Sequence, residues 1–337
     1  MSDNLVPVMN FKDFQSDQEV RWCPGCDDYV ILRAMQKALP QMGKKKEDFV
    51  FVSGIGCSSR FPYYVDTYGL HGIHGRAPAI ATGVKLSNPD LSVWIITGDG
   101  DAMAIGGNHF IHLIRRNLDI KLVMFNNEIY GLTKGQFSPT SKMEQRTKTS
   151  PYGNIQPPFE PGKLALGSEA KYFARLPGND PKYLEELFIE AEKFKGTAVI
   201  EVLQNCVIFN DGAFTDVTDR KIREDVQLRV VHGERMIFGK EKNKGIRLNG
   251  LHLEVVTIGE DGITEEDILV HDAHTMDTTL HQMLINMQNP VVMGEIRKVE
   301  QIPYDEMYME RMDRVTKQSS YKKADDLFFS GDTYEVD

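Results

Sequence analysis

The strongest constraint on the fold is a change of hydrophobic period that repeats along the chain, in which short apolar runs alternate with longer segments of helical spacing. Residues 93–97 (VWIIT) and 120–125 (IKLVMF) are runs of the first kind, and residues 106–116 between them repeat apolar positions with helical spacing. Apolar, β-branched runs of this length are typical of strands that are buried on both faces of a parallel sheet. We therefore expect an α/β fold with a doubly wound parallel sheet.

The same alternation predicts most of the other elements. Strands are expected at residues 49–53, 172–176 and 198–203, with short strands at 255–258 and 291–293. Helices are expected at residues 27–39, 76–86 and 181–195. Residues 138–162 are rich in Ser, Thr, Pro and Lys and have no apolar period, so they are predicted to form a long functional loop.

Length suggests more than one structural unit, because 337 residues exceed the usual size of a single domain. We expect a polar N-terminal arm over residues 1–20 and a main α/β domain over residues 21–213. After Asn210 the hydrophobic pattern loosens. Residues 214–337 are therefore expected to form a less regular C-terminal extension that packs on the core or on a partner subunit.

Composition argues against several classes of function. The formal net charge is −10, and no dense run of Lys and Arg with interleaved aromatic residues occurs, which argues against a nucleic-acid partner. No apolar run approaches the roughly 20 residues that cross a bilayer, and residues 1–19 are too acidic and polar for a signal peptide. We therefore expect no membrane partner and a cytoplasmic location, where a reducing environment keeps thiols available.

Two polar motifs directly follow the two central predicted strands. Gly98-Asp99-Gly100-Asp101 follows the first, and Asn126-Asn127 follows the second. The carboxyl ends of parallel strands meet at one edge of a sheet, so both motifs should face one crevice. Mg²⁺ takes oxygen ligands and usually keeps positions for phosphate oxygens and water. We predict a magnesium and diphosphate site with ligands from the Asp99 carboxylate, the Asn127 amide oxygen and the Ile129 backbone carbonyl.

The flanking residues fit this prediction, although a plainer interpretation exists. Gly98 and Gly100 let the backbone approach an anion closely. Asp101 is expected to cap the following helix or to support the metal site from behind. Alternatively, Gly-Asp-Gly is only a turn and Asn-Asn only ends a strand, which is the commoner explanation for motifs this short. The strand, helix and strand around them favour the metal site.

Four cysteines suggest a second group. Cys23 and Cys26 form a Cys-x-x-Cys pair, whereas Cys57 and Cys206 each follow a predicted strand. From the sequence alone, an iron–sulfur cluster, a zinc site and structural thiols remain open. A compact zinc module would normally carry its second pair together, and isolated cysteines are often small buried hydrophobic residues.

These motifs, in this order and spacing, resemble a known family. Gly-Asp-Gly followed after some twenty-five residues by Asn-Asn is similar to the fingerprint of thiamine diphosphate enzymes. Residues 22–141 resemble the β subunit of 2-oxoacid:ferredoxin oxidoreductases. The segments 56–62 (GCSSRFP), 74–76 (HGR) and 130–136 (YGLTKGQ) are similar to the 2-oxoglutarate type.

The resemblance implies cofactors and site residues. It implies thiamine diphosphate, Mg²⁺ and one [4Fe-4S] cluster held by the four cysteines. Substrate contacts are expected from Arg60, which could pair with the distal carboxylate of 2-oxoglutarate, and from Leu132 and Lys134. Arg60 could equally be a surface residue. The residues expected to bind the cofactor are Gly56, Cys57, Ser58, His74, Gly98, Asp99, Gly100, Asp101, Asn127 and Ile129.

The resemblance also implies a reaction and partners. The implied reaction is the coenzyme A-dependent oxidative decarboxylation of a 2-oxo acid, with ferredoxin as electron acceptor. Only one half of a thiamine diphosphate site is present in the sequence, so an obligate α subunit is expected to complete it. Pyruvate or branched-chain 2-oxo acids are alternative substrates. A non-redox thiamine diphosphate decarboxylase or synthase, and a non-catalytic metal scaffold, are alternative functions.

Overall fold

The computed structural model describes residues 8–336 and contains one large and one small β-sheet in that range. The strands of the large sheet are β1 (Phe49–Ser53), β2 (Tyr68–His71), β3 (Ser92–Gly98), β4 (Ile120–Asn126), β5 (Tyr172–Pro177), β6 (Ala198–Leu203), β7 (Gln227–Val230) and β11 (Val291–Lys298). The strands of the small sheet are β8 (Ile237–Phe238), β9 (Lys244–Asn249) and β10 (His252–Thr257).

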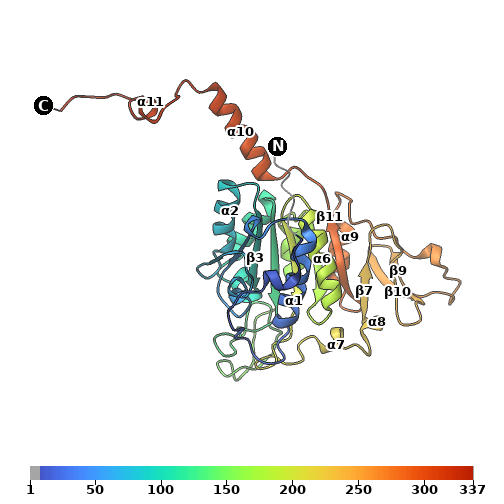
Figure 1. Cartoon of the computed structure of the whole chain (residues 1–337). Coiled ribbons are helices and arrows are strands. Elements are labelled where there is room, and N and C mark those ends of the chain that lie inside the picture. Colours follow the sequence, from blue (N-terminus) through green and yellow to red (C-terminus); the bar gives the residue numbers. More distant parts are fainter. Residues whose placement is uncertain (1–7, 337) are drawn as a thin grey trace.

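The large sheet has the order β2-β1-β3-β4-β6-β5-β11-β7. All neighbours from β2 to β5 pair in parallel, whereas β11 pairs antiparallel to β5 and parallel to β7. Helices lie in front of and behind this sheet in Figure 1. The α/β fold with a mostly parallel sheet is confirmed.

Helices cover both faces of the sheet. The α-helices are α1 (Asp28–Ala38), α2 (Ala77–Ser87), α3 (Asp99–Met103), α4 (Gly107–Arg116), α5 (Pro161–Gly167), α6 (Pro181–Lys193), α7 (Thr215–Thr218), α8 (Arg223–Val226), α9 (Thr279–Asn286), α10 (Tyr304–Gln318) and α11 (Ala324–Phe328). Short 3₁₀ helices span Phe11–Phe14, Leu39–Met42, Lys46–Asp48, Ser58–Tyr63 and Glu265–Asp267. One apolar core joins α1 and α6 to the sheet, and a second joins α2, α4, α5 and α9 to its other face.

Most predicted elements are present, and the strands at 49–53 and 198–203 agree to the residue. The predicted loop at 138–162 is wrong at its end, because α5 already begins at Pro161 with a proline in its first turn. The strand predicted at 291–293 is longer than expected, since β11 is paired on both sides and runs to Lys298.

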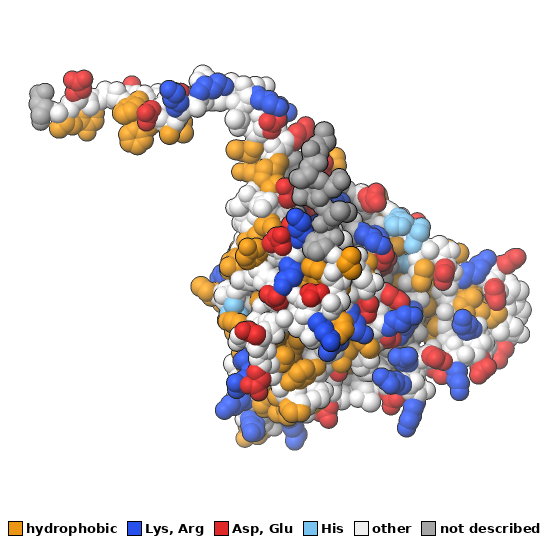
Figure 2. Space-filling view, in the orientation of Figure 1, with side chains coloured by type: hydrophobic (Ala, Val, Ile, Leu, Met, Phe, Trp, Pro, Cys, Tyr) orange, Lys and Arg blue, Asp and Glu red, His pale blue; other side chains and the backbone are white. Residues whose placement is uncertain are grey.

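The segment after residue 213 is more regular than its pattern indicated. It adds β7 and β11 to the large sheet and forms the whole small sheet. The division of the chain at residue 213 stays a prediction. At the C-terminus, α10 and α11 lead away from the body of the molecule (Figure 1), and apolar as well as charged side chains are exposed along them (Figure 2). Among residues 8–336, no helix is both long and apolar enough to cross a membrane.

Two buried lysines share one carboxylate at the amino-terminal edge of the sheet. The Lys85 amino group lies 3.2 Å and the Lys121 amino group 2.5 Å from carboxylate oxygens of Asp119. Both lysine side chains are almost completely buried. Burial alone would raise the pKa of Asp119, but the ammonium groups of Lys121 and Lys85 outweigh it and hold that pKa below its usual value.

Replacing this carboxylate is expected to destabilise the fold. Asp119→Asn leaves two buried ammonium groups without a counter-charge, which should cost about 3 kcal/mol at pH 7. Because the pKa of Asp119 is lowered in the folded state, its contribution is present above the unfolded pKa and is lost as the pH falls through the folded pKa. Urea unfolding at pH 7 and in acid measures both effects. Asp90→Asn, at an exposed position, is the matched control, and equal losses in the two variants would contradict the prediction.

Candidate active site

A small pocket lies where the carboxyl ends of the central parallel strands meet. It contains both polar motifs that the sequence singled out, and one of the cysteines. Its volume is about 80 Å³, well below the roughly 300 Å³ or more of sites that enclose a small molecule. The lining residues are Asp28, Ile55, Gly56, Cys57, Ser58, His74, Gly98, Asp99, Gly100, Asp101, Phe125, Asn127, Ile129, Tyr130, Gly131, Leu132 and Thr133.

Asp99 is positioned by the end of β3 and by hydroxyl groups from the long loop between β4 and α5. Its Oδ2 accepts hydrogen bonds from Thr140 Oγ1 at 2.6 Å and from Ser138 Oγ at 2.5 Å. Burial raises the pKa of Asp99, and these hydroxyl donors partly offset that rise. Because both hydroxyl donors use Oδ2, Oδ1 is the oxygen better placed to serve as a metal ligand.

The Asn126-Asn127 pair is fixed by two different sets of contacts. The Asn126 amide donates to Glu201 Oε1 at 2.8 Å, and Glu201 Oε2 accepts from Arg175 Nε at 2.8 Å. These three side chains are buried. The next residue, Asn127, turns into the pocket, and its Oδ1 accepts the backbone N–H of Ile129 at 3.2 Å. A carbonyl oxygen has a second lone pair, so this contact leaves Asn127 able to bind a cation.

Asp101 does not cap the helix, contrary to one of the two expected roles. Its Oδ1 accepts the backbone N–H groups of Gly75 at 2.7 Å and Ile55 at 3.1 Å, and its Oδ2 accepts Thr97 Oγ1 at 2.7 Å. His74 Nδ1 also lies 2.7 Å from Oδ1. The carboxylate therefore holds two neighbouring loops against the end of β3. No side chain caps α3, which Gly98 precedes in an extended conformation.

Two glycines are required by close packing around the pocket. A Cβ atom on Gly100 would lie 2.2 Å from the ring of Tyr130, whose hydroxyl donates to the Gly100 carbonyl at 3.1 Å. Gly75 has a φ of +70°, and a Cβ there would lie 2.5 Å from the backbone nitrogen of Gly106. The backbone of Gly106 cannot move away cheaply, and the half-buried ring of Tyr130 is held by its hydrogen bond to Gly100.

A pair of glycine substitutions should therefore have opposite effects. Gly75→Ala forces both a positive φ and a backbone overlap, and is expected to destabilise the protein by about 1–3 kcal/mol. Gly83→Ala places a methyl group in open space within α2 and is expected to stabilise it by about 0.5–1 kcal/mol. Urea unfolding of both variants tests the pair. The prediction fails if Gly75→Ala is as stable as the parent protein.

Three of the four cysteines gather beside this pocket, and the fourth lies close to them. The Sγ atoms of Cys206 and Cys57 lie 3.4 and 3.6 Å from the Cβ position of Gly131. Burial raises the pKa of the Cys57 thiol to about 12, with smaller contributions from Cys206 and Cys23. Burial likewise raises the pKa of Cys26, with contributions from Cys206 and Cys57. All four are free thiols, and Cys23 is exposed.

The donor set around these thiols includes a buried carboxyl group that the sequence analysis missed. Asp28 lines the pocket, and its side chain is only 1% exposed. Among the described residues, neither of its carboxylate oxygens has a hydrogen-bond partner. Burial raises the pKa of Asp28 to about 7. Within residues 8–336, no three His, Cys, Asp or Glu side chains are arranged to hold a single metal ion.

The predicted substrate residues are spread over the pocket rim. Leu132 lines the pocket, whereas Lys134 and Arg60 lie outside its lining. Arg60 Nε donates to the hydroxyl of Tyr64 at 2.9 Å, and its charge lowers the pKa of Cys57 against the effect of burial. Lys134 has a φ of +76° in the turn after β4. Their roles toward a substrate stay predictions.

Comparison with known proteins identifies the family. The model of the C-terminal TPP-binding domain of thiamine pyrophosphate enzymes matches residues 54–202. The 2-oxoglutarate oxidoreductase subunit KorB of Mycobacterium tuberculosis is 46% identical over 332 residues, which cover 97% of this chain and 88% of that relative. The 2-oxoglutarate synthase subunit KorB of Archaeoglobus fulgidus is 46% identical over 185 residues, or 55% of this chain and 69% of the relative.

A solved structure agrees with these relatives. It is 2-oxoglutarate:ferredoxin oxidoreductase from Magnetococcus marinus with 2-oxoglutarate, coenzyme A and succinyl-CoA bound, and one of its chains superposes with a TM-score of 0.78 at 30% identity. The match covers 98% of both chains. Identity of this extent along almost the whole sequence, with the two polar motifs and a cysteine in one pocket, shows that the chain belongs to the KorB family, the β subunits of 2-oxoacid:ferredoxin oxidoreductases.

Proposed function

We propose that this chain is the β subunit of an enzyme that converts 2-oxoglutarate and coenzyme A to succinyl-CoA and CO₂, reversibly, with ferredoxin as electron acceptor. The observation that carries the proposal is that Asp99 and Asn127 line the same pocket as Cys57, whose sulfur lies, like that of Cys206, beside the Cβ position of Gly131. The proposed decarboxylation site and the proposed iron–sulfur cluster would thus lie next to each other at one pocket. The names of the relatives support 2-oxoglutarate as the substrate.

The polar residues fit a magnesium ion and a diphosphate group. Asp99 Oδ1, the Asn127 amide oxygen and the Ile129 carbonyl are the proposed protein ligands, and a few oxygen ligands with room for phosphate are what Mg²⁺ accepts. Gly98 and Gly100 keep the backbone open to the diphosphate, and Gly56, Ser58 and His74 border the same space. Thiamine diphosphate, when bound, supplies an electron sink that lets a 2-oxo acid lose CO₂.

The thiols fit an iron–sulfur cluster. Cys23, Cys26, Cys57 and Cys206 are the proposed ligands of one [4Fe-4S] cluster, since such clusters are held by four thiolates. The raised thiol pKa values of Cys57 and Cys26 reflect burial without a cation, and binding iron would favour the thiolate form. Four free thiols also fit a reducing compartment such as the cytoplasm.

The small size of the pocket supports a site shared with another subunit. A volume of about 80 Å³ cannot enclose the cofactor, so we propose that an α subunit closes the other side and supplies most of the coenzyme A site. Ile73, which precedes the pocket residue His74, and Ile105, which lies close to Gly75, are exposed apolar residues. The name of the structural neighbour supports coenzyme A as the second substrate.

Anaerobic copurification of this chain with its α subunit tests the proposal. The complex should bind thiamine diphosphate only with Mg²⁺, contain iron, and reduce a viologen dye when both coenzyme A and 2-oxoglutarate are present. Pyruvate and branched-chain 2-oxo acids are the comparison substrates. A higher kcat/KM for one of them would show that this acid, and not 2-oxoglutarate, is the preferred substrate. Full activity of the isolated chain, or activity without iron, would refute the proposed division of roles.

A further inference from the structure

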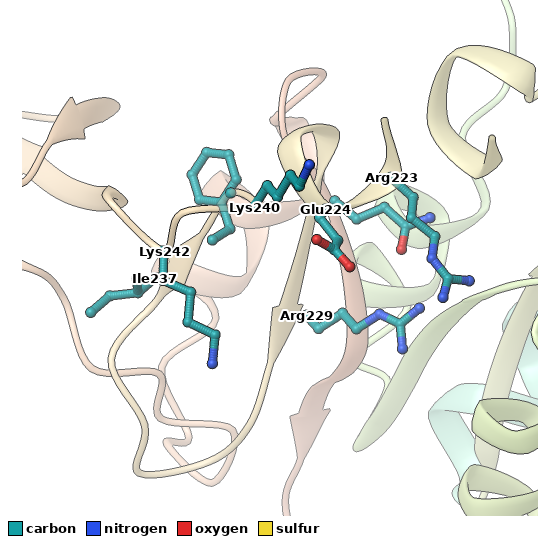
Figure 3. A pocket seen from close by; sticks show the side chains of 9 residues that line it. Arg223, Glu224, Arg229, Ile237, Lys240 and Lys242 are labelled. Atoms are coloured by element: carbon teal, nitrogen blue, oxygen red, sulfur yellow. The ribbon is translucent and has the colours of Figure 1, made fainter. Parts of the chain in front are cut away.

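A positively charged cavity lies between the edge of the large sheet and the small sheet (Figure 3). Its volume is about 350 Å³, and four of its lining residues are basic: Arg223, Arg229, Lys240 and Lys242. Glu224 is its only acidic lining residue. Such a concentration of positive charge is unexpected in a chain whose net charge is −10.

The two sides of this basic cavity differ in how well their charges are balanced. Arg229 lies 2.8 Å and Arg223 3.5 Å from Asp180 Oδ2, so these two arginines share one carboxylate. Among residues 8–336, no carboxylate oxygen lies within 4 Å of the amino group of Lys240 or Lys242. Figure 3 shows the two lysines on the opposite wall from the arginines, with Glu224 between. The lining therefore carries four basic side chains against one carboxylate, Glu224, and its two lysines form no ion pair within the described residues.

The N-termini of two packed helices, α1 and α6, lie between the basic cavity and the thiol site. Asp180 precedes α6 and Asp27 precedes α1, and these two helices pack side by side. Between them, the Cβ position of Gly178 lies 3.2 Å from Asp27 Oδ2. Asp27 follows Cys26 directly, so Asp180 lies at the start of the helix that packs beside the one following the cysteine loop. Cys23 in that loop is exposed.

We propose that the basic cavity and the exposed Cys23 loop together form the docking surface for ferredoxin, as a small acidic iron–sulfur carrier. This inference rests on the proposed function. Surfaces of opposite charge steer partners and raise association rates without large contact areas, and electron-transfer encounters are among the smallest specific interfaces. A cluster held by the four thiols would lose one electron as the oxidised ferredoxin cluster gains it, with no bond formed or broken. Two such transfers would complete one turnover.

The test compares two electron acceptors in the purified αβ complex. In Lys240→Glu/Lys242→Glu, the KM for ferredoxin is expected to rise by about tenfold or more at low ionic strength, with little change in kcat. The rate with a small viologen dye should stay unchanged, because the dye needs no docking surface. Glu224→Gln removes the opposing charge and should lower the ferredoxin KM. The dependence of kcat/KM on salt should be weaker in the double lysine variant than in the parent.

The control makes the same charge change far from the thiols. Lys322→Glu/Lys323→Glu lies on the protruding C-terminal arm (Figure 1) and should leave the ferredoxin KM unaltered. The proposal is overturned if the two double variants have the same ferredoxin KM, or if Lys240→Glu/Lys242→Glu releases the α subunit on gel filtration. If the unmodified complex did not reduce viologen, the result would instead refute the proposed function.

Discussion

Replacing Asp99 by asparagine is expected to abolish magnesium-dependent binding of thiamine diphosphate while leaving the fold intact. The change removes the one anionic ligand and keeps the shape of the side chain. Removing a residue that merely supports a metal ligand typically costs 10–100-fold in affinity, so loss of the ligand itself should cost more than about 100-fold. Because Asp99 is buried and burial raises its pKa, the amide should not destabilise the protein without cofactor.

Calorimetric titration of the αβ complex with thiamine diphosphate, at several Mg²⁺ concentrations, measures this loss. Thr140→Val is an informative companion, because Thr140 orients Asp99 without facing the pocket, and it should cost about 10–100-fold. Asp90→Asn, at an exposed position before β3, is the matched control and should bind the cofactor normally. Tight binding by Asp99→Asn would place the metal elsewhere.

The fold was predictable wherever one short segment carried the signal. β3, β4 and β6 are buried on both faces and mostly apolar, so their runs stand out without knowledge of any neighbour. β2 was missed because all of its residues are exposed at the edge of the sheet, where no apolar pattern is required. β7 was missed because it is only four residues long and Arg229 interrupts it.

The residues of the candidate site were likewise predictable only where one short segment carried the signal. Asp99 and Asn127 were predictable because each directly follows a strand, and parallel pairing then brings them together. Ser138 and Thr140, which hold Asp99, belong to a loop whose return path depends on tertiary packing. Only the polar composition of that loop hinted at function. Asp28 was missed because a carboxylate beside a Cys-x-x-Cys pair normally faces solvent, whereas α1 turns this one inward.

The basic cavity was hidden for a different reason. Its charges come from α8, β7 and the turn after β8, so no segment of the sequence contains a dense basic run. Acidic residues alternate with them along the chain, and the net charge of −10 pointed away from any positive surface. Folding pairs some of these charges, Asp225 with Lys244 and Asp180 with the two arginines, and leaves Lys240 and Lys242 without an ion pair among the described residues. Local charge can therefore be assigned only after the strands are placed.

Replacing Cys57 by serine is expected to abolish iron binding and electron transfer while leaving thiamine diphosphate binding intact. Serine keeps the size of the side chain but is a poor ligand for iron–sulfur clusters, which are held by thiolates. The iron content of the complex should fall from about four atoms per β subunit to near zero. Thiamine diphosphate binding should persist, because the contacts that fix Asp99 and Asn127 do not involve the thiol. Viologen reduction should then fall to background, since electrons have no path out of the pocket.

Each of the other three thiols supplies a comparison. Cys23→Ser, Cys26→Ser and Cys206→Ser should give the same loss of iron if all four bind one cluster. Cys23 is the most discriminating of them, because it is exposed while the other three are partly buried, so its replacement leaves packing undisturbed. A Cys23→Ser complex that keeps its iron and its viologen activity would show that Cys23 is not a cluster ligand. The exposed Cys23 loop would then no longer support the proposed ferredoxin docking surface.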